Sequence, residues 1–201
     1  MQPSILIADD HSMIRKGMKL YLQFNLDCTD ITEVSSCNEL MTELGKKKFT
    51  HLILDIILTD GSTLEVIPDI REAYPEIELL IFSMQPQDIY GQALEEYGIR
   101  YYISKTSDEE EIISSLHKFL QNETPAPSPT HNTVNPFKTL ARRELEVLHY
   151  VLKGADTKEI AEILNLKMNT VFTLETCIYE KTNAGNIKEL IELATLYNVN
   201  F

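Results

Sequence analysis

The chain has 201 residues, of which 43% are hydrophobic and 24% are charged, enough apolar material for one or two globular domains. No stretch of about 20 apolar residues predicts a membrane span, and the N-terminus lacks the basic and apolar segments of a signal peptide. Three scattered cysteines argue against a disulfide framework and fit a reducing compartment. We therefore expect a cytoplasmic protein that does not bind membranes.

The formal net charge of -13 is unevenly distributed along the chain. Residues 1–136 carry 10 Lys and Arg against 22 Asp and Glu, a net of -12, whereas residues 137–201 carry 8 against 9, a net of -1. Such acidity favours solubility and opposes nonspecific contact with polyanions.

Before residue 121, short apolar segments alternate with amphipathic ones. We expect strands at residues 4–8, 29–35, 51–55, 78–83 and 101–104, and helices near 12–24, 38–47, 64–74, 86–97 and 108–120. The third strand is apolar on both faces, which is typical of a buried parallel strand. This alternation predicts an α/β domain with a doubly wound, five-stranded parallel sheet of flavodoxin-like order 2-1-3-4-5. Ligands of such sheets bind at the carboxyl ends of the strands.

Residues 121–136 contain four prolines among small polar residues and predict a semi-rigid linker. The alternative, a long loop within one domain, is uncommon in compact proteins. After the linker we expect no strand and four helices, near 141–153, 157–164, 168–181 and 187–197. A very short connection around Asn165 joins the second and third, which predicts a helix-turn-helix. The domains are thus expected at 1–120 and 137–201, the second being smaller and all-α.

Side chains capable of phosphate chemistry follow four of the predicted strands. Asp9 and Asp10 follow the first strand, Asp55 ends the third, Ser83 ends the fourth and Lys105 follows the fifth. A single acid at a strand end is usually a turn or cap residue, but five such groups at one sheet edge indicate a site. Clustered carboxylates suit Mg²⁺, which takes one or two of them with water and phosphate oxygens. An aspartate there can accept a phosphoryl group, with transfer depending mainly on positioning and charge neutralisation.

Four segments resemble the signature segments of receiver domains in NarL/FixJ two-component response regulators: ILIADDHSMIRKGMKLYL, LILDIILTDGSTLEVI, LLIFSMQ and GIRYYISK. The resemblance covers residues 4–120. It implies that Asp55 accepts a phosphoryl group from a sensor histidine kinase. It also implies an Mg²⁺ site formed by Asp10 and Asp55 directly, Asp9 through water, and the backbone carbonyl of Ile57.

The same resemblance implies roles in switching. Ser83 is the hydroxyl that moves toward the phosphate, Tyr102 is the aromatic side chain that changes rotamer with it, and Lys105 bridges to the phosphate. Phosphorylation is then expected to promote a homodimer or to release the effector domain.

Three residues depart from the receiver pattern. Thr59 stands where the family usually has proline and Thr63 where it has glycine, while Asp60 adds a negative charge that could alter Mg²⁺ affinity or phosphate lifetime. An aspartyl-phosphate phosphatase is an alternative, but it needs an acid/base two residues after the nucleophile, where this chain has Ile57. We therefore expect no enzymatic turnover beyond slow self-dephosphorylation.

Residues 140–164, LARRELEVLHYVLKGADTKEIAEIL, resemble the start of a LuxR-type helix-turn-helix, and the likeness extends over 137–197. Gly154 is suited to the C-terminal cap of the first helix. The resemblance implies that the third helix enters the DNA major groove and regulates transcription. Its candidate DNA contacts are Lys167, Asn169, Thr170, Thr173 and Lys181.

The third helix, which would be the DNA-recognition helix, is poor in basic residues. This leaves two functions open for the C-terminal domain. The family often has Lys, Arg or His where this chain has Asn169, Phe172, Leu174 and Ile187, and the domain lacks the basic footprint of a DNA binder. In one output, DNA binding draws on further cations: Lys138, Arg142, Arg143, Lys158 and Lys188. In the other, DNA binding is weak or lost and a protein interface uses Phe172, Leu174, Ile178 and Tyr179. The family base rate favours the first.

Overall fold

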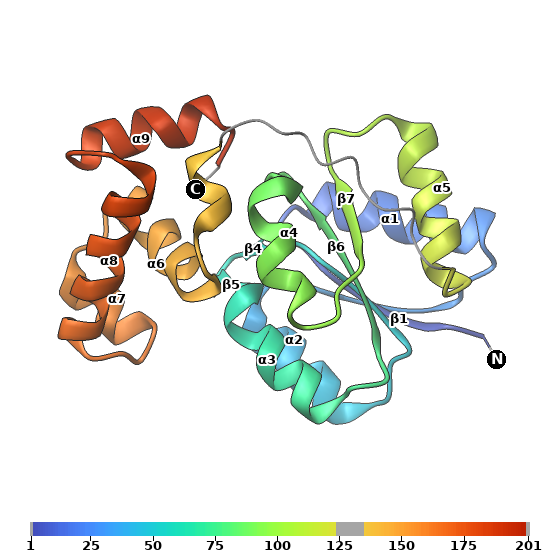
Figure 1. The fold of residues 1–201 in the computed structure, drawn as a ribbon. Helices are drawn as coiled ribbons and strands as arrows, with labels where there is room; N and C mark the ends of the chain where they lie inside the picture. Colours follow the sequence, from blue (N-terminus) through green and yellow to red (C-terminus); the bar gives the residue numbers. More distant parts are fainter. Residues whose placement is uncertain (1, 124–134, 200–201) are drawn as a thin grey trace. The chain divides into compact units, whose positions relative to one another are not determined.

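The computed structural model describes residues 2–123 and 135–199 (Figure 1). Five parallel strands form one sheet in the order β2-β1-β3-β6-β7, so the predicted order 2-1-3-4-5 is confirmed. The strands are β1 (Ser4–Ala8), β2 (Asp30–Val34), β3 (His51–Leu54), β6 (Glu78–Ser83) and β7 (Tyr101–Ser104). Their register aligns Ala8 with Leu54, Leu54 with Ile81, and Ser83 with Ser104. The segments that follow these residues therefore leave the sheet at one edge.

Helices cover both faces of the sheet (Figure 1). On one face, α1 (Ser12–Asn25) and α5 (Glu109–Leu120) contribute Met18, Leu22, Leu116 and Phe119 to a buried cluster with side chains of the strands. On the other face lie α2 (Cys37–Lys46) and α3 (Thr63–Ala73), whose buried residues follow helical spacing. Because both faces are covered, the central strands are apolar throughout, as their sequences indicate.

The structure also contains short elements that the sequence patterns do not predict. A two-stranded antiparallel hairpin, β4 (Ile57–Leu58) and β5 (Gly61–Ser62), follows β3. Ser62 and Glu65 then form a capping box at the start of α3. The helix α4 (Gln87–Glu95) is shorter at both ends than the predicted 86–97.

In the described residues 135–199, all regular elements are helices. A short 3₁₀ helix η1 (Pro136–Thr139) precedes α6 (Arg142–Leu152), α7 (Thr157–Ile163), α8 (Met168–Thr182) and α9 (Ile187–Leu196). Gly154 follows α6 with φ +83 and so completes its C-terminal cap as predicted. Between α7 and α8, Asn165 takes the left-handed φ of 50, which asparagine tolerates better than most residues, so two helices are joined within four residues.

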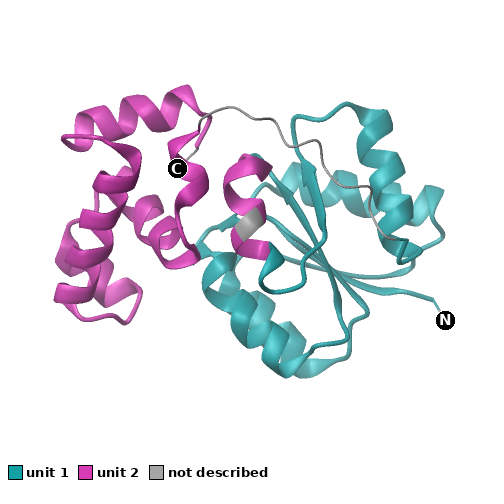
Figure 2. Ribbon diagram, viewed as in Figure 1, with its two compact units in different colours: residues 1–84, 95–128 teal, residues 85–94, 129–201 magenta. Residues whose placement is uncertain are grey.

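The chain divides into two compact units, residues 1–84 with 95–128 and residues 85–94 with 129–201 (Figure 2). The predicted linker at 121–136 falls largely on residues 124–134, outside the described part of the chain, so the boundaries at 120 and 137 stay predictions. No helix among the described residues is both long enough and apolar enough to cross a lipid bilayer.

Candidate phosphoacceptor site and helix-turn-helix

Four of the predicted site residues contact one another at the carboxyl ends of β1, β3, β6 and β7. The Ser83 hydroxyl donates a hydrogen bond to Asp55 Oδ1 at 2.5 Å. Lys105 Nζ lies 2.5 Å from Asp55 Oδ2 and 2.7 Å from Asp9 Oδ2. The side chains of Lys105 and Asp55 are only 2% and 6% exposed. Each carboxylate oxygen of Asp55 thus has its own donor inside a nearly closed site.

The carboxylates of this cluster outnumber its ammonium groups, so a bound cation would stabilise it. Three carboxylates, those of Asp9, Asp10 and Asp55, lie within reach of one another, and Lys105 supplies a single ammonium to two of them. Burial raises the pKa of Asp55, although Lys105 and Ser83 act to lower it. Since burial disfavours carboxylate charge, a divalent cation would stabilise the ionised form.

The donor atoms present fit Mg²⁺. Asp9, Asp10, His11 and Asp55 each offer one ligand atom, and these atoms all lie within 4.8 Å of one another. Asp10 Oδ1 is buried and, among the described residues, accepts no hydrogen bond, although His11 Nδ1 lies 2.6 Å away. A buried carboxylate oxygen beside two other carboxylates suits a hard cation that prefers oxygen ligands.

His11 and Thr63 belong to this site although sequence reasoning gave neither of them a role in it. The backbone amide of His11 donates to Asp9 Oδ1 at 2.8 Å, which fixes the rotamer of that carboxylate. Thr63 is fully buried, and its hydroxyl donates to the backbone carbonyl of Asp55 at 2.8 Å. The departure from glycine at position 63 was the only signal for this second contact.

The other departures from the family pattern also have structural roles. The Asp60 carboxylate accepts hydrogen bonds from the backbone amides of Cys37 at 2.6 Å and Asn38 at 3.0 Å. It therefore neutralises the N-terminal end of α2 rather than only adding charge beside the cluster. The Thr59 hydroxyl donates to the carbonyl of Ser35 at 3.0 Å.

Two further predicted residues lie close in sequence to the cluster. Ile57 begins β4, two residues after Asp55. Tyr102 is half-buried in β7 and pairs in register with Ile81 of β6. Their expected roles, as a carbonyl ligand and a switch aromatic, stay predictions.

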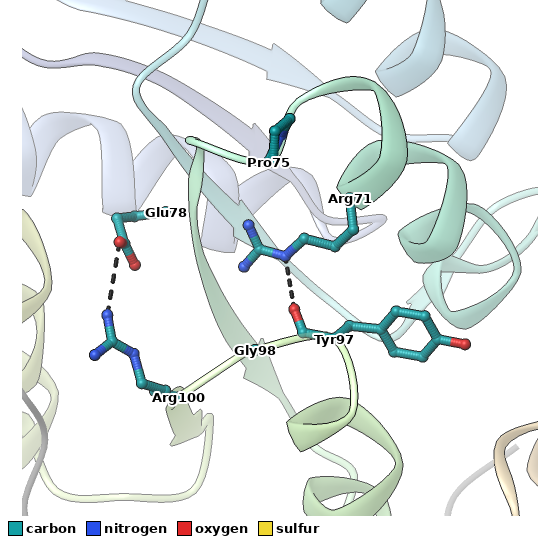
Figure 3. Close-up of a pocket in the computed structure, with 6 residues that line it drawn as sticks. All are labelled: Arg71, Pro75, Glu78, Tyr97, Gly98 and Arg100. Carbon is teal, nitrogen blue, oxygen red and sulfur yellow. Dashed lines mark hydrogen bonds and ion pairs between the residues drawn. The ribbon is translucent and has the colours of Figure 1, made fainter.

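A separate pocket lies at the opposite end of the strands, where β6 begins (Figure 3). It has a volume of about 190 Å³ and contains two guanidinium groups, each of which is engaged. Arg71 Nε donates to the carbonyl of Tyr97 at 2.8 Å, and Arg100 lies 3.6 Å from Glu78. The pocket thus links α3, β6 and the turn before β7, and it is not part of the acidic cluster.

Comparison with known proteins identifies both parts of the chain. Residues 5–117, more than half of the sequence, match the response regulator receiver domain. The chain belongs to the response regulator family. Residues 138–194 of this response regulator match the luxR family of bacterial regulatory proteins, so the receiver and the LuxR-type helix-turn-helix expected from the sequence are both confirmed. The chain is a two-component response regulator of the type that regulates transcription.

Relatives match this response regulator along nearly its whole length. The oxygen regulatory protein NreC of Staphylococcus carnosus is 30% identical, and that of Staphylococcus epidermidis is 31% identical, each over 94% of this chain and 95% of the relative. Among solved structures, RcsB from Salmonella enterica serovar Typhimurium bound to promoter rprA has a TM-score of 0.85 at 20% identity. That match covers 97% of this chain and 99% of RcsB, and it supports the fold.

The response regulator presents four of the five predicted DNA contacts on the N-terminal half of α8 or just before it. Lys167, Asn169, Thr170 and Thr173 are all exposed. Lys181 instead lies 2.7 Å from Glu144 and donates to the carbonyl of Thr139 at 3.1 Å. Its ammonium is thus engaged with the body of its own domain.

Most other candidate residues for DNA or protein binding are paired or buried within the helical domain. Arg142 and Arg143 both pair with Glu146, whose side chain is fully buried. Ile178 is buried, and Leu174 and Tyr179 are half-buried. Of the four residues considered for a protein interface, Phe172 alone is classed as exposed.

Proposed function

We propose that this response regulator accepts a phosphoryl group on Asp55 from a sensor histidine kinase. The observation that carries the proposal is that Ser83 and Lys105 each donate to one oxygen of the Asp55 carboxylate. A carboxylate oxygen of Asp55 forms the bond to phosphorus as the bond from phosphorus to the donor breaks, leaving an acyl phosphate. Ser83 and Lys105 then donate to the phosphate oxygens.

Mg²⁺ is the proposed cofactor of this transfer. Asp10, Asp55 and the backbone carbonyl of Ile57 would hold it directly, and Asp9 through water. When bound, the ion supplies positive charge that offsets the charge of the incoming phosphoryl group. The residues of the chain orient the acceptor and keep bulk water from it, because Asp55 is almost completely buried.

Phosphorylation is proposed to act through Ser83 and Tyr102. When the hydroxyl of Ser83 turns toward the phosphate, the half-buried ring of Tyr102 takes up the space that this movement opens. The surface that changes then promotes a homodimer. Structures of the relative RcsB include two RcsB dimers bound to two parallel DNAs.

The proposed output is transcription regulation through DNA binding by α8. The NreC relatives carry the name oxygen regulatory protein, and RcsB structures hold promoter DNA. Lys167, Asn169, Thr170 and Thr173 are the proposed contacts, since all four are exposed. Lys158 and Lys188 are also highly exposed and have only 3.9 Å pairs with their helix neighbours, so they can supply phosphate contacts.

The first test follows phosphorylation by intact-protein mass spectrometry, with a small phosphodonor and Mg²⁺. The wild type gains one phosphoryl group, and Asp55→Asn gains none because its amide cannot form the acyl phosphate. Asp60→Asn is the matched control: it alters a nearby acid that caps α2 and retains labelling. Undiminished labelling of Asp55→Asn would place the phosphate on another residue.

The second test examines DNA binding by a mobility-shift assay, with a duplex from upstream of the chain's own coding region. The phosphorylated wild type binds, and the affinity falls as salt rises because phosphate contacts release counterions. Absent or salt-insensitive binding contradicts the DNA output and favours a protein partner, while leaving the Asp55 proposal intact.

A further inference from the structure

The first three turns of α8 carry no positive charge. The segment 168–178 contains no lysine or arginine. Val171 and Ile178 point into the domain and are buried, whereas Met168 and Phe172, four residues apart, are 53% and 65% exposed. The exposed residues recur at helical spacing and so share one face: Met168, Asn169, Phe172, Thr173 and Thr176.

Two charged groups on α8 are engaged within the domain, whereas Glu180, four residues after Thr176, is exposed at the C-terminal end of this face. Lys181 pairs with Glu144, and Glu175 accepts hydrogen bonds from the Thr157 hydroxyl at 3.1 and 3.3 Å. The hydroxyls of Thr173 and Thr176 donate to carbonyls of their own helix, those of Asn169 and Phe172. Since these two hydroxyls are turned toward the backbone, the exposed surface between Met168 and Thr176 is mostly apolar, with Asn169 as a polar side chain within it.

An apolar face can distinguish only one feature of the major groove. Guanine, cytosine and adenine present hydrogen-bond donors and acceptors there, whereas thymine also presents its 5-methyl group. Side chains such as phenylalanine and the methyl of threonine contact that group, and arginine or lysine are the usual partners of guanine. Within 168–178 the helix therefore has no cation with which to select guanine and has a clear means of selecting thymine, while Lys167, directly before it, is the nearest lysine.

We propose that α8 reads thymine through its 5-methyl group, with Phe172 as the specificity-determining residue and Met168 beside it. The proposal rests on the proposed function, in which α8 enters the major groove. Asn169 complements it, because an asparagine amide pairs with adenine through N6 and N7. The preferred half-site is thus rich in A·T pairs, and removing a methyl group from it weakens binding.

The test uses the phosphorylated full-length protein and a duplex enriched from a random-sequence pool by the wild type. The enriched duplex is made with thymidine or with deoxyuridine, which pairs identically but lacks the 5-methyl group. For each contacted methyl removed, the wild type loses affinity about fourfold, the value expected for burying one methyl-sized group. Fluorescence anisotropy measures both duplexes at fixed salt.

Phe172→Ala binds the thymidine and deoxyuridine duplexes equally, because the group that senses the methyl is gone. Ile163→Ala is the matched control, since Ile163 is 50% exposed on α7 and not on the α8 face. It retains the wild-type preference for thymidine.

Each contrary outcome has a distinct meaning. Equal binding of both duplexes by the wild type overturns thymine reading and leaves DNA binding in place. Retained discrimination in Phe172→Ala overturns the role of that residue. No enrichment of any duplex refutes the DNA output itself, and the inference with it, and points to a protein as the partner of Phe172.

Discussion

His149 is a buried titratable residue on α6, in the second unit of the chain. This histidine is only 3% exposed, and neither of its ring nitrogens has a hydrogen-bond partner among the described residues. The ring packs edge-on against Tyr150, with 5.0 Å between ring centroids. Burial lowers the pKa of His149 to about 4, so the folded protein holds this histidine neutral.

This lowered pKa predicts a pH-dependent free energy of unfolding. Between the unfolded pKa of about 6.5 and the folded value of about 4, the unfolded chain binds a proton that the folded chain does not. Stability is therefore fully present above about pH 6.5 and falls as the pH falls toward 4, by up to about 3 kcal/mol. His149→Leu removes this dependence.

Urea unfolding followed by circular dichroism at pH 5 and pH 7.5 measures the difference between variant and wild type, so that titrations common to both cancel. His117→Leu, at a half-buried position on α5, is the control and keeps the wild-type dependence. The same loss of stability at low pH in His149→Leu would contradict the prediction.

At this scale the sequence predicted the groups of the acidic cluster but not all of their partners. Asp9, Asp55, Ser83 and Lys105 could be found because parallel strands bring their carboxyl ends to one edge. Thr63 could not, since its hydroxyl meets the Asp55 carbonyl only after the β4–β5 hairpin turns the chain back. The pairing of Lys181 with Glu144 likewise spans 37 residues, and no local pattern predicts it.

Two glycines, one after the end of α6 and one within α1, are expected to respond in opposite ways to replacement by alanine. Gly154 ends α6 with φ +83, a conformation that L side chains rarely adopt. Gly17 lies on the exposed side of α1, within the helix. A Cβ at either position has no heavy atom within 4 Å, so backbone preference alone decides the effect of an added methyl.

Gly154→Ala is expected to destabilise the helical domain by about 1 kcal/mol or more, because alanine is strained at positive φ. Gly17→Ala is the matched control and stabilises its own domain by about 1 kcal/mol, because alanine favours a helix over glycine. Hydrogen exchange of α6 and α1 peptides across a urea series measures each domain separately. Effects of the same sign would show that backbone conformation is not the cause.

The helices and central strands follow from sequence periodicity, but the smallest elements do not. The hairpin β4–β5 has only two residues in each strand, too few for an alternating pattern to be visible. The ends of α4 also differ from prediction, since boundaries depend on local hydrogen bonds such as that from the Tyr90 amide to the Pro86 carbonyl.

For the whole molecule, charge is the dominant property. Every copy carries a net charge of -13, so two copies repel one another, and salt screens this repulsion. The same salt weakens contacts between lysines and DNA phosphates. Self-association and DNA binding should therefore respond to salt in opposite directions.

We expect the dimer fraction of the phosphorylated protein to rise as ionic strength increases from about 0.01 M to about 0.1 M, where the Debye length falls from about 30 to about 10 Å. Sedimentation velocity measures the fraction, and Asp55→Asn with the phosphodonor present is the control and stays monomeric. A dimer that forms equally in Asp55→Asn would show that association does not depend on phosphorylation.

The sequence by itself determined the receiver sheet, the helix-turn-helix and the set of residues that we propose accept and bind a phosphoryl group. It did so because hydrophobic periodicity and strand-end positions are local properties of the chain. Only the tertiary structure decided which charges are available, since that depends on contacts between distant segments. Lys181 and Arg142 are engaged within the helical domain, whereas Phe172 remains exposed on α8, because folding pairs cations with buried acids and leaves this ring on the outer face.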